Sequence, residues 1–183
     1  MTFVVDGTNG LTFNDATTQS STATNASNIS SGTLGKARLP TGSVLQVVQG
    51  STNTQISTAS TSFVTTNLSA SITPSSSTSK ILVLMSMGDV GAQNAGSGVN
   101  GAGFALYKNG SSLTSNLGNQ ISYNSISSSG LTIGGFSSAY LDSPATTSAT
   151  TYAVYFRTAG ASSTMYIFRD NTFGVITLME ISA

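Results

Sequence analysis

Hydrophobic residues recur along most of the chain in short clusters whose spacing is that of β-strands. Apolar and polar residues alternate over residues 68–72, which places Leu68, Ala70 and Ile72 on one face. The same alternation runs through residues 151–157. No segment keeps helical spacing over three turns. The pattern therefore predicts an all-β protein with very little helix.

The clusters and the turn-forming residues between them place the strands. Strands are expected at residues 2–5, 11–13, 44–49, 63–64, 68–72, 81–87, 104–107, 111–114, 120–126, 131–141, 151–157, 164–168 and 175–181. The turn at Lys108-Asn109-Gly110 predicts a hairpin. Residues 81–87 are almost continuously apolar, which is typical of a strand buried on both faces. The glycine-rich residues 88–103 are expected to form a loop.

The number and spacing of these strands favour a sandwich or a barrel, and roughly eight to ten strands suit a jelly roll. At the carboxyl-terminal end, Val175, Met179 and Ile181 are expected to share one face, and Ile176 and Leu178 the other. The strand topology is left open by these patterns.

Composition divides the chain into residues 1–40 and residues 41–183. Residues 14–31 are almost entirely Ser, Thr, Asn, Ala and Gln. Without a partner they bury too little apolar surface to offset an ordering cost of about 1–2 kcal/mol per residue. They are either a flexible linker or an arm that orders against other subunits or a particle. Pro40 restricts Leu39 to an extended conformation, which suits a hinge before the β-sandwich of residues 41–183.

The low content of charged residues bears on which binding partners the protein can have. Charged residues make up 7% of the chain, with six basic and six acidic side chains, against roughly 25% in an average soluble protein. A net charge of zero gives no long-range attraction to nucleic acid. The longest apolar run is far shorter than the ~20 residues of a membrane-spanning helix. The first residues lack the features of a secretion signal. We expect no nucleic-acid partner, no membrane insertion and no export by that route.

The residue types needed for most catalytic chemistry are missing. The chain has no His and no Cys, which excludes a Ser–His–Asp triad, disulfides, and imidazole or thiolate metal sites. The acidic residues are scattered, and Lys36, Lys80 and Lys108 lie beside turns or in the hinge. Residues 96–103 lack the Gly-Lys-Ser/Thr ending of a phosphate-binding loop. We predict that the protein is not an enzyme and has no catalytic residue, cofactor or metal; a glycan-degrading enzyme is a remote alternative.

Aromatic side chains could bind sugars by stacking and hydrogen bonding. Tyr107, Tyr123 and Tyr140 are candidates by residue type. Packing within the sheets is the more common role of a strand tyrosine. The sequence therefore identifies sugar-binding candidates without assigning a site.

Two stretches resemble bacteriophage proteins. Residues 5–19, which contain Asp6-Gly7-Thr8-Asn9-Gly10, resemble a segment of tail-fibre-like proteins of marine and cyanobacterial phages. Residues 29–34 and 37–40 are similar to linker repeats of phage fibres. The larger part is similar to a β-sandwich module that recurs in phage virion proteins. Its markers are residues 70–76, 79–83, Leu106-Tyr107-Lys108-Asn109-Gly110, 142–144, 151–152 and 176–181.

The resemblance implies a jelly-roll-like module that forms homotrimers on the surface of the virion. The amino-terminal arm would attach it to capsid or tail proteins, and the candidate attachment residues are Phe3, Val5, Leu11, Phe13, Leu34 and Arg38. We expect a short fibre or spike that aids host adhesion, with a host-surface glycan as a further partner. Because the chain has room for an arm and one head but no shaft, a capsid decoration or cement protein is the alternative.

Trimer formation also has a motive in the residue pattern. Several strands carry apolar residues on both faces, which is more hydrophobic surface than the core of one sandwich needs. Burial of the excess between subunits would remove it from water. The sequence does not separate a trimer from other symmetric assemblies.

Overall fold

The computed structural model describes residues 4–6, 10–12, 18–19, 35, 38–94, 98–124, 131–159 and 163–183. Contacts divide the chain into two units, Met1–Leu39 and Pro40–Ala183. In the first unit, β1 (Val4–Asp6), β2 (Gly10–Thr12) and β3 (Thr18–Gln19) form a small antiparallel sheet in that order. Strands therefore occur at the two places that the sequence predicts in this unit. Most of residues 14–31 lie outside the described residues.

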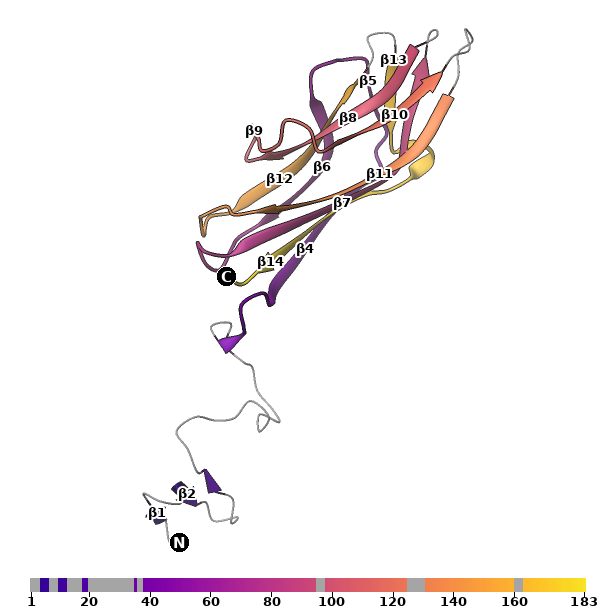
Figure 1. Ribbon diagram of the computed structural model, residues 1–183. Coiled ribbons are helices and arrows are strands. Elements are labelled where there is room, and N and C mark those ends of the chain that lie inside the picture. Colours follow the sequence, from indigo (N-terminus) through magenta and orange to yellow (C-terminus); the bar gives the residue numbers. More distant parts are fainter. Residues whose placement is uncertain are drawn as a thin grey trace. The chain divides into compact units, whose positions relative to one another are not determined.

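The second unit consists of antiparallel strands joined by turns (Figure 1). Its strands are β4 (Val44–Thr52), β5 (Ile56–Thr58), β6 (Val64–Ile72), β7 (Lys80–Asn94), β8 (Gly98–Lys108), β9 (Ser111–Ser112), β10 (Gly118–Asn124), β11 (Leu131–Asp142), β12 (Thr150–Thr158), β13 (Ser163–Ile167) and β14 (Gly174–Ile181). A 3-10 turn, η3 (Arg169–Asn171), separates the last two strands. Among the described residues, no helix has the length and hydropathy that crossing a bilayer requires.

The strand order identifies a jelly roll. One sheet, which we call the first sheet, has the order β4-β14-β7-β11. Beyond the end of β14, β13 pairs with residues 90–94 of β7, and β5 pairs with β13. Thus β13 continues the position of β14, and β5 continues that of β4. The second sheet has the order β6-β12-β8-β10. Counting the continued strands once gives eight strands that pass between two antiparallel sheets in the jelly-roll sequence. The predicted jelly-roll-like β-sandwich is confirmed.

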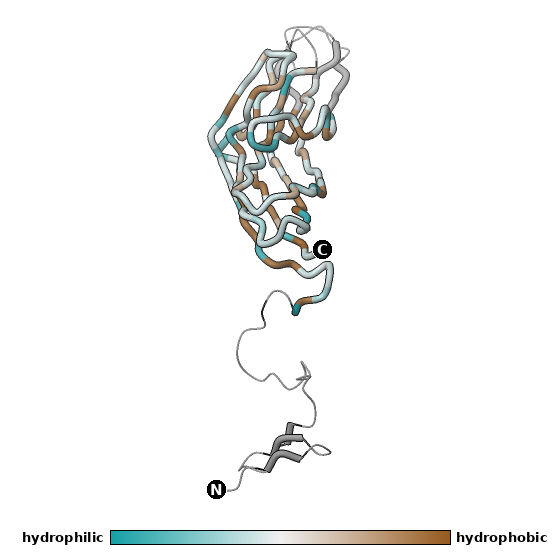
Figure 2. Tube along the Cα trace, turned by 90° about the vertical axis from the view of Figure 1, so that its left-hand side faces the viewer, coloured by the Kyte–Doolittle hydropathy of each residue, from teal (hydrophilic) through white to brown (hydrophobic). Residues whose placement is uncertain are grey.

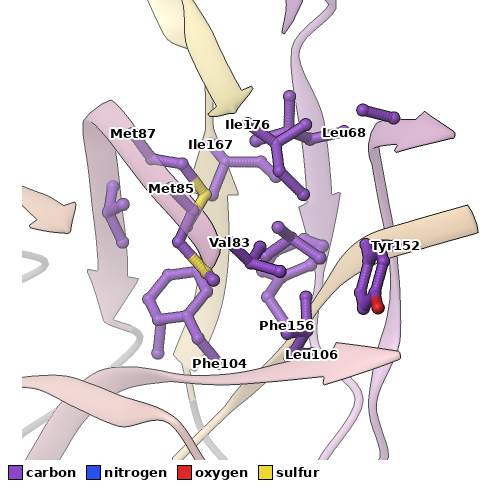
Figure 3. Packing of buried hydrophobic residues seen from close by; sticks show 14 of the residues in the cluster. Leu68, Val83, Met85, Met87, Phe104, Leu106, Tyr152, Phe156, Ile167 and Ile176 are labelled. Carbon is purple, nitrogen blue, oxygen red and sulfur yellow. The ribbon is translucent and has the colours of Figure 1, made fainter. Parts of the chain in front are cut away.

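The two sheets enclose one hydrophobic core (Figure 3). Leu68 and Phe156 from the second sheet and Val83 from the first are fully buried in it. Phe104 of β8 stacks on Phe136 of β11 with ring centroids 4.1 Å apart, which joins the sheets at one edge. Burial of each large side chain contributes about 1.5–3 kcal/mol. Hydrophobic and polar residues alternate along these strands, as the sequence pattern predicts (Figure 2).

The faces assigned to single residues agree with the prediction for β6, β12 and β14. Ile176 and Leu178 are buried, while Val175, Met179 and Ile181 are half-buried on the outer side. For β7 the prediction of burial on both faces is wrong. Residues 81, 83, 85 and 87 are buried, but Leu82 and Leu84 are half-buried and Ser86 is exposed. The physical reason is that a sandwich covers only one face of each sheet.

The predicted loop over residues 88–103 is also wrong. Strand β7 continues to Asn94 and β8 begins at Gly98. A Cβ atom on Gly103 would lie 3.0 Å from Oδ1 of Asn119 and 3.1 Å from Nε of Arg157. Glycine here permits close approach between strands and does not form a turn.

The predicted hairpin is confirmed at Lys108-Asn109-Gly110. Asn109 and Gly110 have φ angles of 49° and 80°, which fits the two positive φ values of a type I′ turn. Lys108 pairs with Ser111, so β8 returns directly into β9. The strand predicted over residues 111–114 is reduced to Ser111–Ser112.

Candidate functional site

The outer side of the first sheet carries a continuous row of apolar side chains. The strand register places Val47 opposite Met179, Met179 opposite Leu82, and Leu82 opposite Leu141. Val47 and Leu141 are 55% and 52% exposed. The row crosses four neighbouring strands, and only the two central side chains are partly covered by their neighbours. Hydrophobic residues therefore occupy outward positions on all four of these strands.

The next two rows, both toward β13 and β5, contain no charged residue, whereas the row on the opposite side contains Lys80 beside Ile181. One row comprises Gln49, Thr177, Leu84 and Ala139, and the next comprises Ser51, Val175, Ser86 and Ser137. We call the three rows together the apolar face. A hollow of about 410 Å³ lies over it, between Leu84, Val175, Thr177 and the serines at 86 and 137. Leu84, Val175 and the Thr177 methyl group give this hollow an apolar lining, and the serines add hydroxyl groups at its edge.

The outer side of the second sheet is polar by comparison. On β6 the outward residues Thr65, Asn67, Ser69 and Ser71 are exposed. Tyr107 of β8 lies on this side and stacks on Tyr155 of β12, with ring centroids 3.8 Å apart. We call this side the polar face.

The three tyrosines proposed as sugar-binding candidates do not come together. Tyr107 lies on the polar face, whereas Tyr140 packs against the core. Tyr123 belongs to β10, and its side chain lies outside the described residues. The sequence analysis missed Tyr155 because its neighbours at 152, 154 and 156 mark a buried strand face. Tyr155 lies between Val154 and Phe156 in this alternation, which places it on the outer side of the strand. That was the signal in the sequence.

The predicted attachment residues are described only in part. Val5 and Leu11 lie directly opposite each other in the β1–β2 ladder. Arg38 is exposed, and its backbone amide donates to the carbonyl of Gly35. The other three candidates, Phe3, Phe13 and Leu34, lie outside the described residues. Their role in attachment stays a prediction.

The buried acidic groups of the second unit hold strands together. Asp142 pairs with Lys108 at 2.9 Å and accepts a hydrogen bond from the Tyr152 hydroxyl at 2.7 Å. Burial, and then this contact with Asp142, raises the pKa of Tyr152 well above its usual range. Asp89 pairs with Arg169 at 3.2 Å. These two carboxylates have cation partners that compensate their burial.

Glu180 is fully buried and has hydrogen-bond donors instead of a cation. The backbone amide and the hydroxyl of Ser75 both donate to its Oε1 at 2.7 Å, and Gln46 Nε2 donates to Oε2 at 2.6 Å. Burial by itself raises the pKa of Glu180, but the hydrogen bonds from Ser75 and Gln46 outweigh it and lower the pKa to about 2. The carboxylate therefore ties the turn after β6 to β4 and β14.

Potential metal ligands are dispersed in the same part of the molecule. Among the described residues, no three His, Cys, Asp or Glu side chains gather closely enough to hold a metal ion.

Comparison with known proteins gives matches among solved structures only. No protein-family model and no curated protein matches the chain. A chain from the structure of infectious bursal disease virus, Gx strain, is similar over 75% of this chain with 15% identity and a TM-score of 0.29. The match covers 36% of that viral chain, so this protein spans about a third of its length. Strand order and register alone establish the jelly roll described above.

Proposed function

We propose that this protein is a non-enzymatic structural component of a bacteriophage particle. It acts as a short homotrimeric fibre or spike that attaches through residues 1–40 and aids adhesion to the host. The phage-fibre resemblance of residues 5–19 and the jelly-roll unit support the location. The apolar face supports the assembly, and it is the observation that carries the proposal.

The size of the apolar face is the physical reason to expect self-association. Strands about 4.8 Å apart and same-face residues about 7 Å apart give three rows across four strands an area on the order of 400 Å². Seven of the twelve residues in these rows are apolar, and the other five are Ser, Thr or Gln. The largest apolar patch on a typical monomer is about 300–600 Å², and such patches often mark interaction sites. The row that contains Leu82 and Met179 would lose contact with water in an assembly.

Other copies of the same chain are the proposed occupants of this face. The chain has no net charge, so copies do not repel one another at long range. The three rows contain no ionised group that would need a partner of opposite charge. A trimer is the assembly that the phage-fibre resemblance implies.

The oligomeric state tests this proposal directly. The wild-type protein should elute with three times the 18.5 kDa chain mass in light-scattering chromatography. Leu82→Lys places a charge in the middle of the apolar face and should give a folded monomer, as checked by circular dichroism. Ser69→Lys, on exposed β6 of the polar face, is the matched control and should remain trimeric. A monomeric wild-type protein at micromolar concentration would contradict the proposal.

The arm and the site of attachment need a second experiment. Deletion of residues 1–40 should abolish incorporation into the phage particle while the second unit remains folded. Adsorption of particles with and without the protein then tests the adhesive role. Equal adsorption would remove host adhesion from the proposal and leave the structural role.

A capsid decoration or cement protein is the second candidate. It is favoured by the division of the chain into a short amino-terminal unit and one compact unit, Pro40–Ala183. A particle reconstruction at side-chain resolution separates the two. An arm on the capsid shell would identify a decoration protein, and an arm on the tail or baseplate would identify a fibre.

A further inference from the structure

A cluster of aromatic and cationic side chains lies on the polar face. Tyr107 and Tyr155 stack with 18° between their ring planes. Arg157 is two residues further along β12 and therefore on the same side. Its guanidinium carbon lies 5.1 Å from the ring centroid of Phe63. We call these four residues the tyrosine–arginine cluster.

Small residues beneath the cluster explain why it can form. The register places Tyr155 opposite Ala105 and Tyr107 opposite Ala153. Arg157 is opposite Gly103, and its Nε lies close to the position that a Cβ would occupy there. Ala105 is 0% exposed although it points outward from the sheet. The large side chains thus lie over a floor of small ones, which fixes their positions.

The cluster retains unused hydrogen-bonding capacity. Within the described part of the chain, neither tyrosine hydroxyl of the stack has a hydrogen-bond partner in the protein. Arg157 donates from Nη1 to the carbonyl of Thr61 at a long 3.3 Å, and its buried Nε has no partner. Arginine has five N–H donors in a planar fork. Because Nε is buried against the sheet, the donors left for a ligand are those of the two Nη nitrogens.

Charge distinguishes Arg157 from the other cations that are partly buried. Lys108 and Arg169 each pair with a carboxylate. Across the residues that the structure describes, no carboxylate pairs with Arg157. Its positive charge is held on the surface by the sheet and by the ring of Phe63, and it is left without an anionic partner. A ligand with a carboxylate would supply that partner.

Amide groups extend the same surface beyond Arg157. Asn119 of β10 is opposite Gly103, and its Oδ1 accepts a hydrogen bond from Nδ2 of Asn116 at 3.0 Å. Sugars offer hydroxyl groups to such amides and to tyrosine hydroxyls, and they offer C–H groups to aromatic rings. The combination fits a sugar more closely than it fits a purely apolar ligand.

We propose that the tyrosine–arginine cluster binds a carboxylate-bearing glycan, such as a chain of uronic acid residues. Arg157 holds the carboxylate, and Tyr107 and Tyr155 contact the sugar ring and its hydroxyls. A neutral glycan would leave the guanidinium without its charge partner, so the acidic sugar is favoured. This inference rests on the proposed adhesive function and names the site and the class of ligand.

Titration calorimetry of the full-length protein with an oligogalacturonate tests the site. The methyl-esterified form of the same oligomer is the matched probe, since it keeps the sugar and loses the charge. Arg157→Gln should weaken binding of the acid form roughly tenfold or more, because it removes a charge-assisted hydrogen-bonded pair. Tyr155→Phe keeps the stacked ring and should weaken binding several-fold. Equal melting temperatures establish that each variant is folded.

Lys80→Gln provides the control for charge. Lys80 is exposed at the start of β7 and has no ion pair among the described residues, so its substitution should leave the affinity unchanged. Absence of binding to the acid form, equal binding of the esterified form, or equal losses in the Arg157 and Lys80 variants would each overturn the proposal.

Adsorption experiments with phage particles distinguish failure of this inference from failure of the proposed function. If phage that carry Arg157→Gln adsorb to the host as well as wild type, the cluster is not the adhesion site, although the fibre role stands. If the protein is not part of the particle, the proposed function fails. The calorimetric result with the purified protein still decides whether the cluster binds acidic sugar.

Discussion

The two outer faces of the sandwich differ far more than the two inner faces. Inside, both sheets contribute fully buried apolar side chains such as Leu68 and Val83. Outside, β6 carries Ser, Thr and Asn, whereas β7 carries Leu82 and Leu84. These strands follow one another in the chain and bury the same kind of inner face. The contrast shows that the core does not require the outward leucines, and the proposed assembly would give them a role.

The largest expected effect on stability comes from removing a side chain from the core that the two sheets share. Phe104→Ala removes a fully buried ring that stacks on Phe136. It should lower the free energy of unfolding by about 3–5 kcal/mol because it leaves a cavity. Phe173→Ala is the control, because Phe173 is 61% exposed, and should change stability by less than about 0.5 kcal/mol. Urea unfolding at fixed protein concentration measures both, and similar losses would argue against the shared core.

Acid should weaken the first sheet through Glu180. Its pKa is lowered from 4.5 to about 2 in the folded protein. The stabilisation is therefore fully present above pH 4.5 and is lost as the pH falls through about 2. The loss is about 3 kcal/mol if no other group compensates. Urea unfolding between pH 6 and pH 2 should show this slope, and Glu180→Gln should flatten it. An unchanged slope in the variant would assign the acid sensitivity to other carboxyl groups.

Protein concentration should distinguish the apolar face from the polar face. If three chains bury the apolar face, a tenfold rise in concentration stabilises each folded chain by about 1 kcal/mol. The melting temperature of the wild type should then rise with concentration. The same dependence is expected for Ser69→Lys but not for Leu82→Lys. Melting temperatures that are independent of concentration in all three proteins would indicate that the face stays open to water.

The smallest effect concerns the tyrosine stack on the polar face. A double-mutant cycle with Tyr107→Ala and Tyr155→Ala should give a coupling energy of about 0.5–1 kcal/mol, as expected for an aromatic pair. Thermal unfolding of the four proteins measures it. A coupling energy near zero would mean that the two rings contribute to stability independently and that their stacking does not stabilise the fold.

Sequence reasoning located most strands because local alternation reports which side chains face inward. It placed Leu68 and Phe156 correctly, and it identified the turn at Asn109-Gly110 from residue types alone. It failed at residues 88–103, where glycine indicates either a turn or a close contact between strands. Only the neighbours of Gly103, which come from β10 and β12, decide between these.

The two candidate surfaces were harder to predict from the sequence. An apolar run such as residues 81–87 has the same pattern whether its second face meets another layer of the chain or another molecule. The stack of Tyr107 on Tyr155 joins strands that are distant in the chain, and no local signal marks it. Arg157 could be recognised as a cation without a carboxylate partner only after the partners of Lys108 and Arg169 were known.

By itself, the sequence determined the all-β class, the inward face of most strands, the hairpin turn and the lack of histidine and cysteine chemistry. Tertiary structure decided the strand order, the register and hence both outer faces. The physical reason is that the period of two in a strand specifies on which side a side chain lies, but not which strand lies beside it. Pairing between distant strands sets the neighbours, and it brought Val47, Met179, Leu82 and Leu141 into one row.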